Sequence, residues 1–162
     1  MVVPSQNNEP LVAHESRLLA GLLQLPLQAE NTTPEEPMLA PHPRALAHLG
    51  DGVYELLIRE WAMARLGLLQ VEQLHNFSIG LARAETQVAC MQWLLPQLTP
   101  AEEALFKHAR NMPVTQSRRK QQGLYRQSTG FEALVGWWYL YAPQRLTLVQ
   151  TWVITHYFQP LA

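Results

Sequence analysis

Cysteine and aspartate are almost absent from this chain of 162 residues, which contains one of each, Cys90 and Asp51. A single thiol excludes a disulfide within the chain and a zinc site built from cysteines, so a reducing compartment is the expected setting. The first residues lack the basic segment and the apolar run of a secretory signal. No apolar run is long enough to cross a bilayer. We therefore expect a cytoplasmic protein with no membrane partner.

Charge is small overall, with a formal net value of −1, but it is unevenly distributed. Residues 1–37 carry five acidic residues and one basic residue, whereas residues 38–162 carry eight acidic and eleven basic residues. No acidic residue occurs from 104 to 131, and six basic residues fall between 107 and 126. A local positive field of this kind attracts a polyanion. The six basic residues are Lys107, Arg110, Arg118, Arg119, Lys120 and Arg126.

The chain divides by composition into a tail and one domain. Residues 1–37 are rich in polar residues and proline, which predicts a flexible tail. Within the tail, residues 17–25 (RLLAGLLQL) could form one short amphipathic helix. Residues 38–162 are long and apolar enough for one domain with its own core.

The spacing of apolar residues predicts an all-α domain, because no segment shows the alternation of a strand. The first predicted helix is apolar on more than one side, which is typical of a helix buried in a domain centre or between subunits. Thr99, Pro100 and Glu102 form the capping-box pattern of a helix start. The first three predicted helices cover residues 44–66, 71–95 and 99–110, and a loop follows at 111–123. A fourth helix is predicted from Tyr125 or Ser128 to Ala142, and Pro143 opens a fifth.

Asp51 stands inside the first predicted helix between Gly50 and Gly52. Glycine weakens a helix by roughly 1 kcal/mol relative to alanine, so two glycines here need a reason. One reason is close approach, since a ligand or another backbone can come near a residue without a Cβ. Glu55, four residues on, shares a helix face with Asp51. The alternative is that Asp51 is an ordinary solvated or hydrogen-bonded residue.

Glu132 is the only acidic residue after Glu103, and it precedes an apolar stretch. Its spacing from Thr129 fits a capping box, so Glu132 could simply cap its helix. The other interpretation is that Glu132 meets Asp51 across a helix pair, where two carboxylates need a shared proton or a cation. Oxygen donors favour Mg²⁺ or Mn²⁺ over zinc. The spacing of the five histidines in residues 38–162 indicates no metal-ligand pair; they are His42, His48, His75, His108 and His156.

The run Arg118, Arg119 and Lys120 falls in the predicted loop and could be only a solvated surface. The basic residues that flank it in the same acid-free stretch favour phosphate binding. The aromatic residues Trp137, Trp138, Tyr139 and Tyr141 have the spacing of a core or a subunit interface, so we do not expect them to stack on bases.

Two segments resemble a known enzyme family. Residues 45–56 (ALAHLGDGVYEL) resemble the signature helix of ribonuclease III, and residues 129–136 (TGFEALVG) resemble its second catalytic helix. The pieces at 98–102 and 125–132 look like the Mini-ribonuclease III branch, which has a catalytic domain only. Two separated motifs in the right order are more specific than either alone. The resemblance implies the all-α ribonuclease III-type fold, with Asp51 and Glu132 as catalytic metal ligands.

The chain departs from the longer members of this family at two positions. Where long ribonuclease III enzymes carry a further glutamate and a further aspartate, this chain has Ala47 and Thr129. The Mini-ribonuclease III branch looks the same at these positions, and the double-stranded-RNA-binding domain of the long forms is absent here as well. The departures therefore fit this branch.

The resemblance implies a Mg²⁺-dependent endoribonuclease that acts as a homodimer on double-stranded RNA. The implied substrate is precursor 23S ribosomal RNA, with a ribosomal protein as a candidate for presenting it. The six basic residues between 107 and 126 are expected to contact the RNA. A catalytically silent module that binds structured RNA during ribosome assembly is the first alternative, supported by the two missing carboxylates. A helical protein-interaction dimer with an incidental basic loop is the second.

Overall fold

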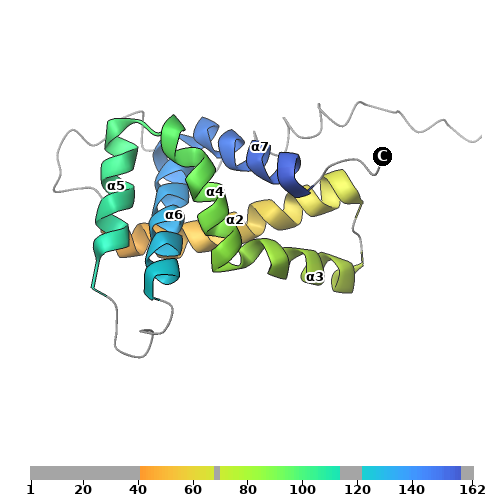
Figure 1. Ribbon diagram of the computed structural model, residues 1–162. Coiled ribbons are helices and arrows are strands. Elements are labelled where there is room, and N and C mark those ends of the chain that lie inside the picture. Colours follow the sequence, from red (N-terminus) through yellow and green to blue (C-terminus); the bar gives the residue numbers. More distant parts are fainter. Residues whose placement is uncertain (1–40, 68–69, 114–121, 158–162) are drawn as a thin grey trace, which may run out of the picture. The chain divides into compact units, whose positions relative to one another are not determined.

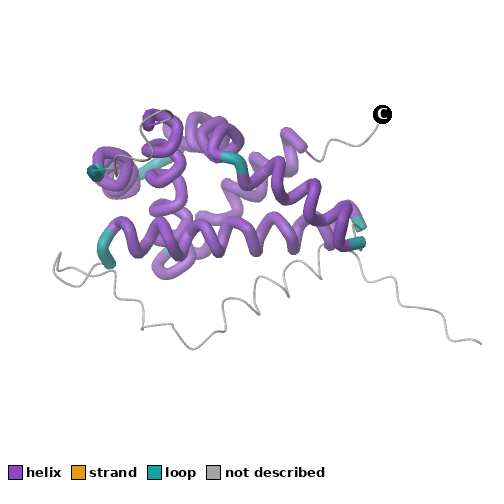
Figure 2. The backbone as a smooth tube through the Cα atoms, turned by 90° about the horizontal axis from the view of Figure 1, so that it is seen from below, coloured by secondary structure: helices purple, strands orange, loops and turns teal. Residues whose placement is uncertain are grey.

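A computed structural model describes residues 41–67, 70–113 and 122–157, and every regular element in these ranges is helical (Figure 2). This confirms the predicted all-α class. The predicted tail at 1–37, its short helix and the basic run at 118–120 lie outside the described residues. The elements are α2 (Pro43–Leu66), α3 (Val71–Ala82), α4 (Ala84–Leu94), η1 (Leu95–Gln97), α5 (Pro100–Asn111), α6 (Gln122–Tyr141), η3 (Pro143–Arg145) and α7 (Leu146–Tyr157).

Helix α2 follows the prediction for residues 44–66 closely. Pro43 occupies its first turn, where a missing N–H costs nothing, and the ring of His42 accepts a hydrogen bond from the backbone N–H of Arg44. Gly67 ends the helix with φ of 60°, a left-handed conformation that favours glycine. None of the helices among the described residues is both long and apolar enough to cross a membrane.

The prediction of one continuous helix over 71–95 was wrong. Arg83 has φ −65° and ψ 145°, an extended conformation that separates α3 from α4. The hydroxyl of Thr86 donates to the carbonyl oxygen of Gly80 across the break (2.8 Å). The apolar pattern runs through this break without a proline, so the sequence carries no clear stop signal there.

Helix α5 begins as predicted, because both hydrogen bonds of the capping box between Thr99 and Glu102 are present. Helix α6 begins earlier than predicted, at Gln122 within the expected loop. Pro143 opens a short 3-10 turn, η3, and α7 begins only after it. Because α6 starts at Gln122, Glu132 lies well inside this helix and not in its first turn.

Helices α2 and α6 form the most extensive contact between two helices of the described structure. They cross backbone to backbone (Figure 1), and two glycines permit it. A Cβ on Gly50 would overlap the carbonyl oxygen of Glu132 and lie 2.7 Å from the amide nitrogen of Gly136. A Cβ on Gly136 would overlap the carbonyl oxygen of Leu46. Close approach thus explains Gly50, whereas a Cβ on Gly52 would meet nothing within 4 Å.

The core surrounds this crossing, with α6 lying between α4 and α5 (Figure 1). Tyr54 packs its ring edge against Phe131 at 5.1 Å, and its hydroxyl donates to the carbonyl oxygen of Leu81 (3.0 Å). Helix α2 is buried on several sides, as predicted, although Leu56 is exposed. The side chains of α2 in the main core are Val53, Tyr54, Leu57, Ile58 and Trp61.

The aromatic residues near the end of α6 divide between core and surface. Trp138 is fully buried, while Trp137, Tyr139 and Tyr141 are half-buried. Trp137 and Tyr139 pack against the main core, and the rings of Trp137 and Tyr141 lie 4.3 Å apart. The core interpretation is therefore confirmed for Trp138 and in part for its neighbours.

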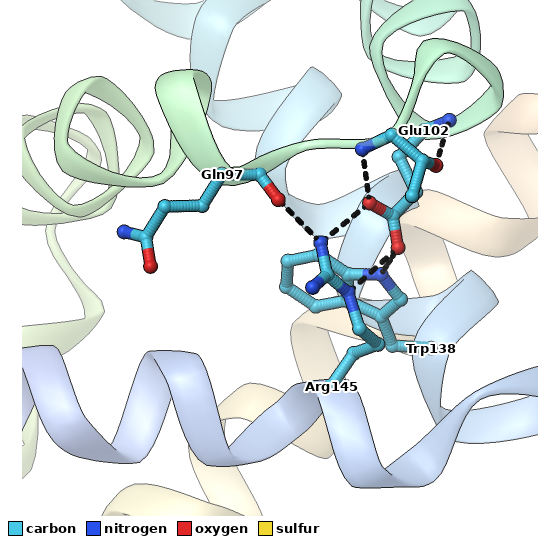
Figure 3. A network of polar contacts seen from close by, with 5 residues as sticks. Gln97, Glu102, Trp138 and Arg145 are labelled. Carbon is cyan, nitrogen blue, oxygen red and sulfur yellow. Dashed lines mark hydrogen bonds and ion pairs between the residues drawn. The ribbon is translucent and has the colours of Figure 1, made fainter.

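A buried polar network fastens α5 to the end of α6 and to η3 (Figure 3). The carboxylate of Glu102, 7% exposed, accepts hydrogen bonds from the indole of Trp138 (2.7 Å) and the guanidinium of Arg145 (2.6 and 2.8 Å). Arg145 also donates to the carbonyl oxygen of Gln97. Burial raises the pKa of Glu102, but the bonds from Arg145, the Thr99 N–H and Trp138, with the charge of Arg145, lower it more.

The glycine contact predicts opposite effects of two matched substitutions in α2. Gly50→Ala should destabilise the protein by about 3 kcal/mol or more, because the added Cβ meets backbone that cannot move aside. Gly52→Ala should stabilise it by about 0.5–1 kcal/mol, because the new methyl meets only open space. Urea denaturation of both variants measures this. Equal effects would show that α2 and α6 do not touch at Gly50.

The network predicts a pH-dependent contribution of Glu102 to stability. Its pKa is below the usual value of 4.5 in the folded state, so its contribution is present above that value and lost as pH falls through the folded pKa. At pH 7, Glu102→Gln should cost about 2 kcal/mol, since hydrogen bonds to a charged group are weakened. Thermal unfolding measures this: the difference in unfolding temperature between the variant and the unsubstituted protein should become smaller from pH 7 to pH 3. A constant difference would contradict the charged network.

Candidate functional site

Asp51 is exposed on α2, directly after the glycine that touches α6. Loss of surrounding water raises the pKa of its carboxyl, the negative charge of Glu55 raises it further, and His48 lowers it. Glu55 lies one turn on and forms an ion pair with Arg59 (2.7 Å). A cation bound at this carboxyl would favour its ionised form.

Glu132 is half-buried near the middle of α6, so it does not cap this helix. The alternative that Thr129 and Glu132 form a capping box is therefore wrong. The hydroxyl of Thr129 instead donates to the carbonyl oxygen of Tyr125, four residues earlier (3.0 Å). The carboxylate of Glu132 has Ser128 beside it, with 3.4 Å between the hydroxyl and Oε1.

The α2–α6 crossing brings the turns that carry Asp51 and Glu132 together. The backbone of Glu132 is the surface against which Gly50 packs, and Asp51 is the next residue of α2. Two segments separated by about half of the chain therefore meet at one point. The hypothesis that a carboxylate from each helix faces the same site stays a prediction, and this backbone contact is its structural support.

The donor set at the crossing fits a hard cation. Among residues 41–67, 70–113 and 122–157, no three side chains of His, Cys, Asp or Glu come together as a metal site. Mg²⁺ is commonly bound through one or two carboxylates and keeps several waters. The pair Asp51 and Glu132 suits that mode, whereas a closed structural zinc site needs four nitrogen or sulfur ligands.

This chain has uncharged residues at the two positions where long ribonuclease III enzymes carry further carboxylates. Ala47 is 6% exposed and packs with Ala109, Met112 and Ala133 in a second, smaller core cluster. A small apolar side chain suits this packed position. Thr129 is half-buried and uses its hydroxyl for the backbone of its own helix. Both positions serve packing and helix structure in this chain.

Of the six basic residues predicted to bind RNA, three are described. Lys107 is exposed and paired with Glu103 on the same helix (2.6 Å). The guanidinium of Arg110 lies over the ring of Phe106, 5.5 Å from its centre. Arg126 is half-buried, and its Nε is the one buried side-chain nitrogen or oxygen of the described residues without a hydrogen-bond partner. Arg118, Arg119 and Lys120 lie outside the described residues.

Two polar residues beside Glu132 were missed by the sequence analysis. Gln87 of α4 and Ser128 of α6 are both buried, and the Ser128 hydroxyl is hydrogen-bonded to the Gln87 side chain. A glutamine within an apolar helix face is a weak signal in a sequence. Ser128 lies one turn before Glu132, which is the only hint that the sequence offered.

Comparison with known proteins matches most of this chain to one family. The ribonuclease III domain family matches residues 44–143. A Mini-ribonuclease 3 of Synechococcus sp. is 39% identical over 116 residues, covering 71% of this chain and 83% of that protein. A Mini-ribonuclease 3 of Thermosynechococcus vestitus is 39% identical over 104 residues, covering 64% of this chain and 68% of that protein.

The fold is also found among solved structures. A crystal structure of a protein from Fusobacterium nucleatum matches with a TM-score of 0.63, covering 75% of this chain and 95% of that chain. Only 20% of the aligned residues are identical, so the likeness shows a shared fold. The arrangement of the helices and the sequence motifs thus indicate the same fold.

Proposed function

Because the chain belongs to the ribonuclease III family, in its Mini-ribonuclease 3 branch, and is an endoribonuclease, we propose that it cleaves double-stranded RNA with Mg²⁺ held by Asp51 and Glu132. Mn²⁺ is the expected substitute. The observation that carries the proposal is the backbone contact at Gly50, which joins the turn of Asp51 to that of Glu132. Each residue also stands in the family motif of its own helix.

The chemistry follows from the charge that develops during phosphodiester hydrolysis. A bound Mg²⁺ supplies Lewis acidity, stabilising negative charge on the phosphoryl oxygens and lowering the pKa of a water nucleophile. Asp51 and Glu132 contribute two negative charges and oxygen donors from opposite helices, which fixes the cation to the crossing. The α2–α6 backbone contact holds together the two turns that carry these carboxylates, and such positioning lowers the cost of reaching the transition state.

RNA binding is assigned to the basic residues between 107 and 126. Lys107 and Arg110 lie along the last turns of α5, and Arg126 lies in the first turns of α6, so the described members cluster at neighbouring ends of two packed helices. Their counterions would be released when RNA phosphates bind. Recognition then rests on the A-form shape, phosphates and 2′-hydroxyls of the duplex.

The remaining parts of the proposal rest on the family alone. A duplex has two strands, and a homodimer supplies one site for each of them. The proposed substrate is precursor 23S ribosomal RNA in the cytoplasm, with a ribosomal protein as a candidate for presenting it. The alternative offered by the sequence is a catalytically silent member that only binds structured RNA, and its ground is the absence of carboxylates at positions 47 and 129.

Substitution of the two carboxylates separates these proposals. Asp51→Asn and Glu132→Gln should each lower the cleavage rate of a long RNA duplex on the order of 1000-fold or more, because each removes half of one metal site. The double substitution should be no slower than either single one, since ligands of one site act as a unit. Duplex binding and the unfolding temperature should change little.

Glu60→Gln is the matched control, because Glu60 is a half-buried carboxylate of the same helix away from the crossing. It should cleave normally. Cleavage that persists in EDTA, or that survives both Asp51→Asn and Glu132→Gln, would overturn the metal site. Binding of duplex RNA without any Mg²⁺-dependent cleavage would instead support the silent module.

The role of the basic residues is tested by substituting each partner of the ion pair between Lys107 and Glu103 in turn. Lys107→Gln and Glu103→Gln both remove the pair, but only the first removes a positive charge. Lys107→Gln should weaken duplex binding and lower the slope of log affinity against log salt by about 1. Glu103→Gln should bind at least as tightly as the unsubstituted protein. Equal behaviour of the two variants in fluorescence titrations would show that Lys107 makes no phosphate contact.

A further inference from the structure

A buried polar side chain on α4 reaches toward Glu132. Gln87 is 1% exposed, and a buried amide is costly unless its groups are hydrogen-bonded. An apolar side chain would serve packing better at this position. The other fully buried residues of α4 are indeed apolar: Cys90, Met91 and Leu94.

Ser128 connects Gln87 with Glu132. Its hydroxyl is hydrogen-bonded to Oε1 of Gln87 and lies 3.4 Å from Oε1 of Glu132. Hydroxyls inside helices commonly donate to the carbonyl four residues earlier, as those of Ser78 and Thr129 do. Ser128 contacts two side chains instead. Its direction is therefore set by its neighbours on α4 and α6.

The amide of Gln87 has two orientations, and one of them lets all three groups satisfy one another. The hydroxyl of Ser128 has one hydrogen, so it can donate fully to only one of its two neighbours. The amide of Gln87 carries a donor and an acceptor at the ends of one planar group. As the structure places it, the Ser128 hydroxyl donates to Oε1 of Gln87. A turn of the Gln87 amide plane by 180° exchanges its oxygen and nitrogen and brings the NH₂ toward Ser128. In that orientation Gln87 donates to Ser128, and the Ser128 hydroxyl hydrogen is directed at the carboxylate of Glu132.

We propose that Gln87 is a positioning residue which, acting through Ser128, holds the carboxylate of Glu132 in the orientation that receives a divalent cation. The inference rests on the proposed role of Glu132 as a metal ligand. Hydrogen bonds to the outer side of ligating carboxylates fix their direction, and their loss typically weakens metal binding or activity by about 10- to 100-fold.

The neighbouring residue on α4 supplies a matched control. Thr86 is buried next to Gln87, but its hydroxyl donates to Gly80 at the α3–α4 break and leads away from Glu132. Thr86→Val and Gln87→Leu each remove a buried polar group of α4 and replace it with a similar apolar volume. A purely structural role predicts that both variants behave alike.

Cleavage kinetics on a model RNA duplex distinguish the two roles. Gln87→Leu should lower kcat about 10- to 100-fold and raise the Mg²⁺ concentration for half-maximal rate, with little change in KM for RNA. Thr86→Val should keep its kcat. Ser128→Ala should reproduce the loss, and the double variant should add nothing to it, because both residues act along one path. Ser128→Ala also serves as the test if Gln87→Leu fails to fold.

Mn²⁺ binding without RNA provides a readout besides activity. Electron paramagnetic resonance of free Mn²⁺ should show affinity about 10-fold weaker for Gln87→Leu and Ser128→Ala, and unchanged for Thr86→Val. Normal kcat and Mn²⁺ affinity in folded Gln87→Leu and Ser128→Ala, with Glu132→Gln inactive, would overturn the positioning role alone. Normal cleavage by Glu132→Gln would instead overturn the proposed function on which it rests.

Discussion

Two glycines, Gly50 and Gly136, let α2 and α6 touch backbone to backbone. The arrangement of the other helices depends on this contact. No side chain separates the helices at this point, so their relative position is set by backbone atoms and cannot adjust to sequence changes elsewhere. The contact places Asp51 beside the turn of Glu132. The same steric constraint therefore shapes the centre of the domain and brings together the two turns that carry Asp51 and Glu132.

The elements around the crossing are fastened to α6 by polar groups. Glu102 joins its own helix start to Trp138 and Arg145, so α5, α6 and η3 share one buried carboxylate. On the other side of α6, Gln87 reaches Ser128 from α4. The first connection lies away from Glu132 and concerns stability. The second ends at Glu132, which is why its loss is expected to appear in metal binding and rate.

Local rules predicted much of this domain from the sequence. The capping box at Thr99, the ends of α2 and the all-α class follow from side-chain chemistry within a few residues. Asp51 and Glu132 drew attention through their immediate neighbours, but their role as metal ligands was implied by the resemblance to ribonuclease III. The structure adds the contact between their turns. The sequence misled where tertiary structure decides. Arg83 breaks a continuous apolar pattern, and Glu132 has the spacing of a cap although α6 began earlier. The link through Gln87 required α4 and α6 to be side by side.

The central claim is that one cation site is formed by Asp51 and Glu132 at the α2–α6 crossing. Its most direct test is anomalous X-ray scattering from crystals of the protein with Mn²⁺ and an uncleaved RNA duplex. The account predicts an Mn²⁺ peak within coordination distance of both carboxylates, about 2.2 Å from an oxygen of each. Mn²⁺ bound only elsewhere, or held by one of the two carboxylates with the other turned away, would contradict it.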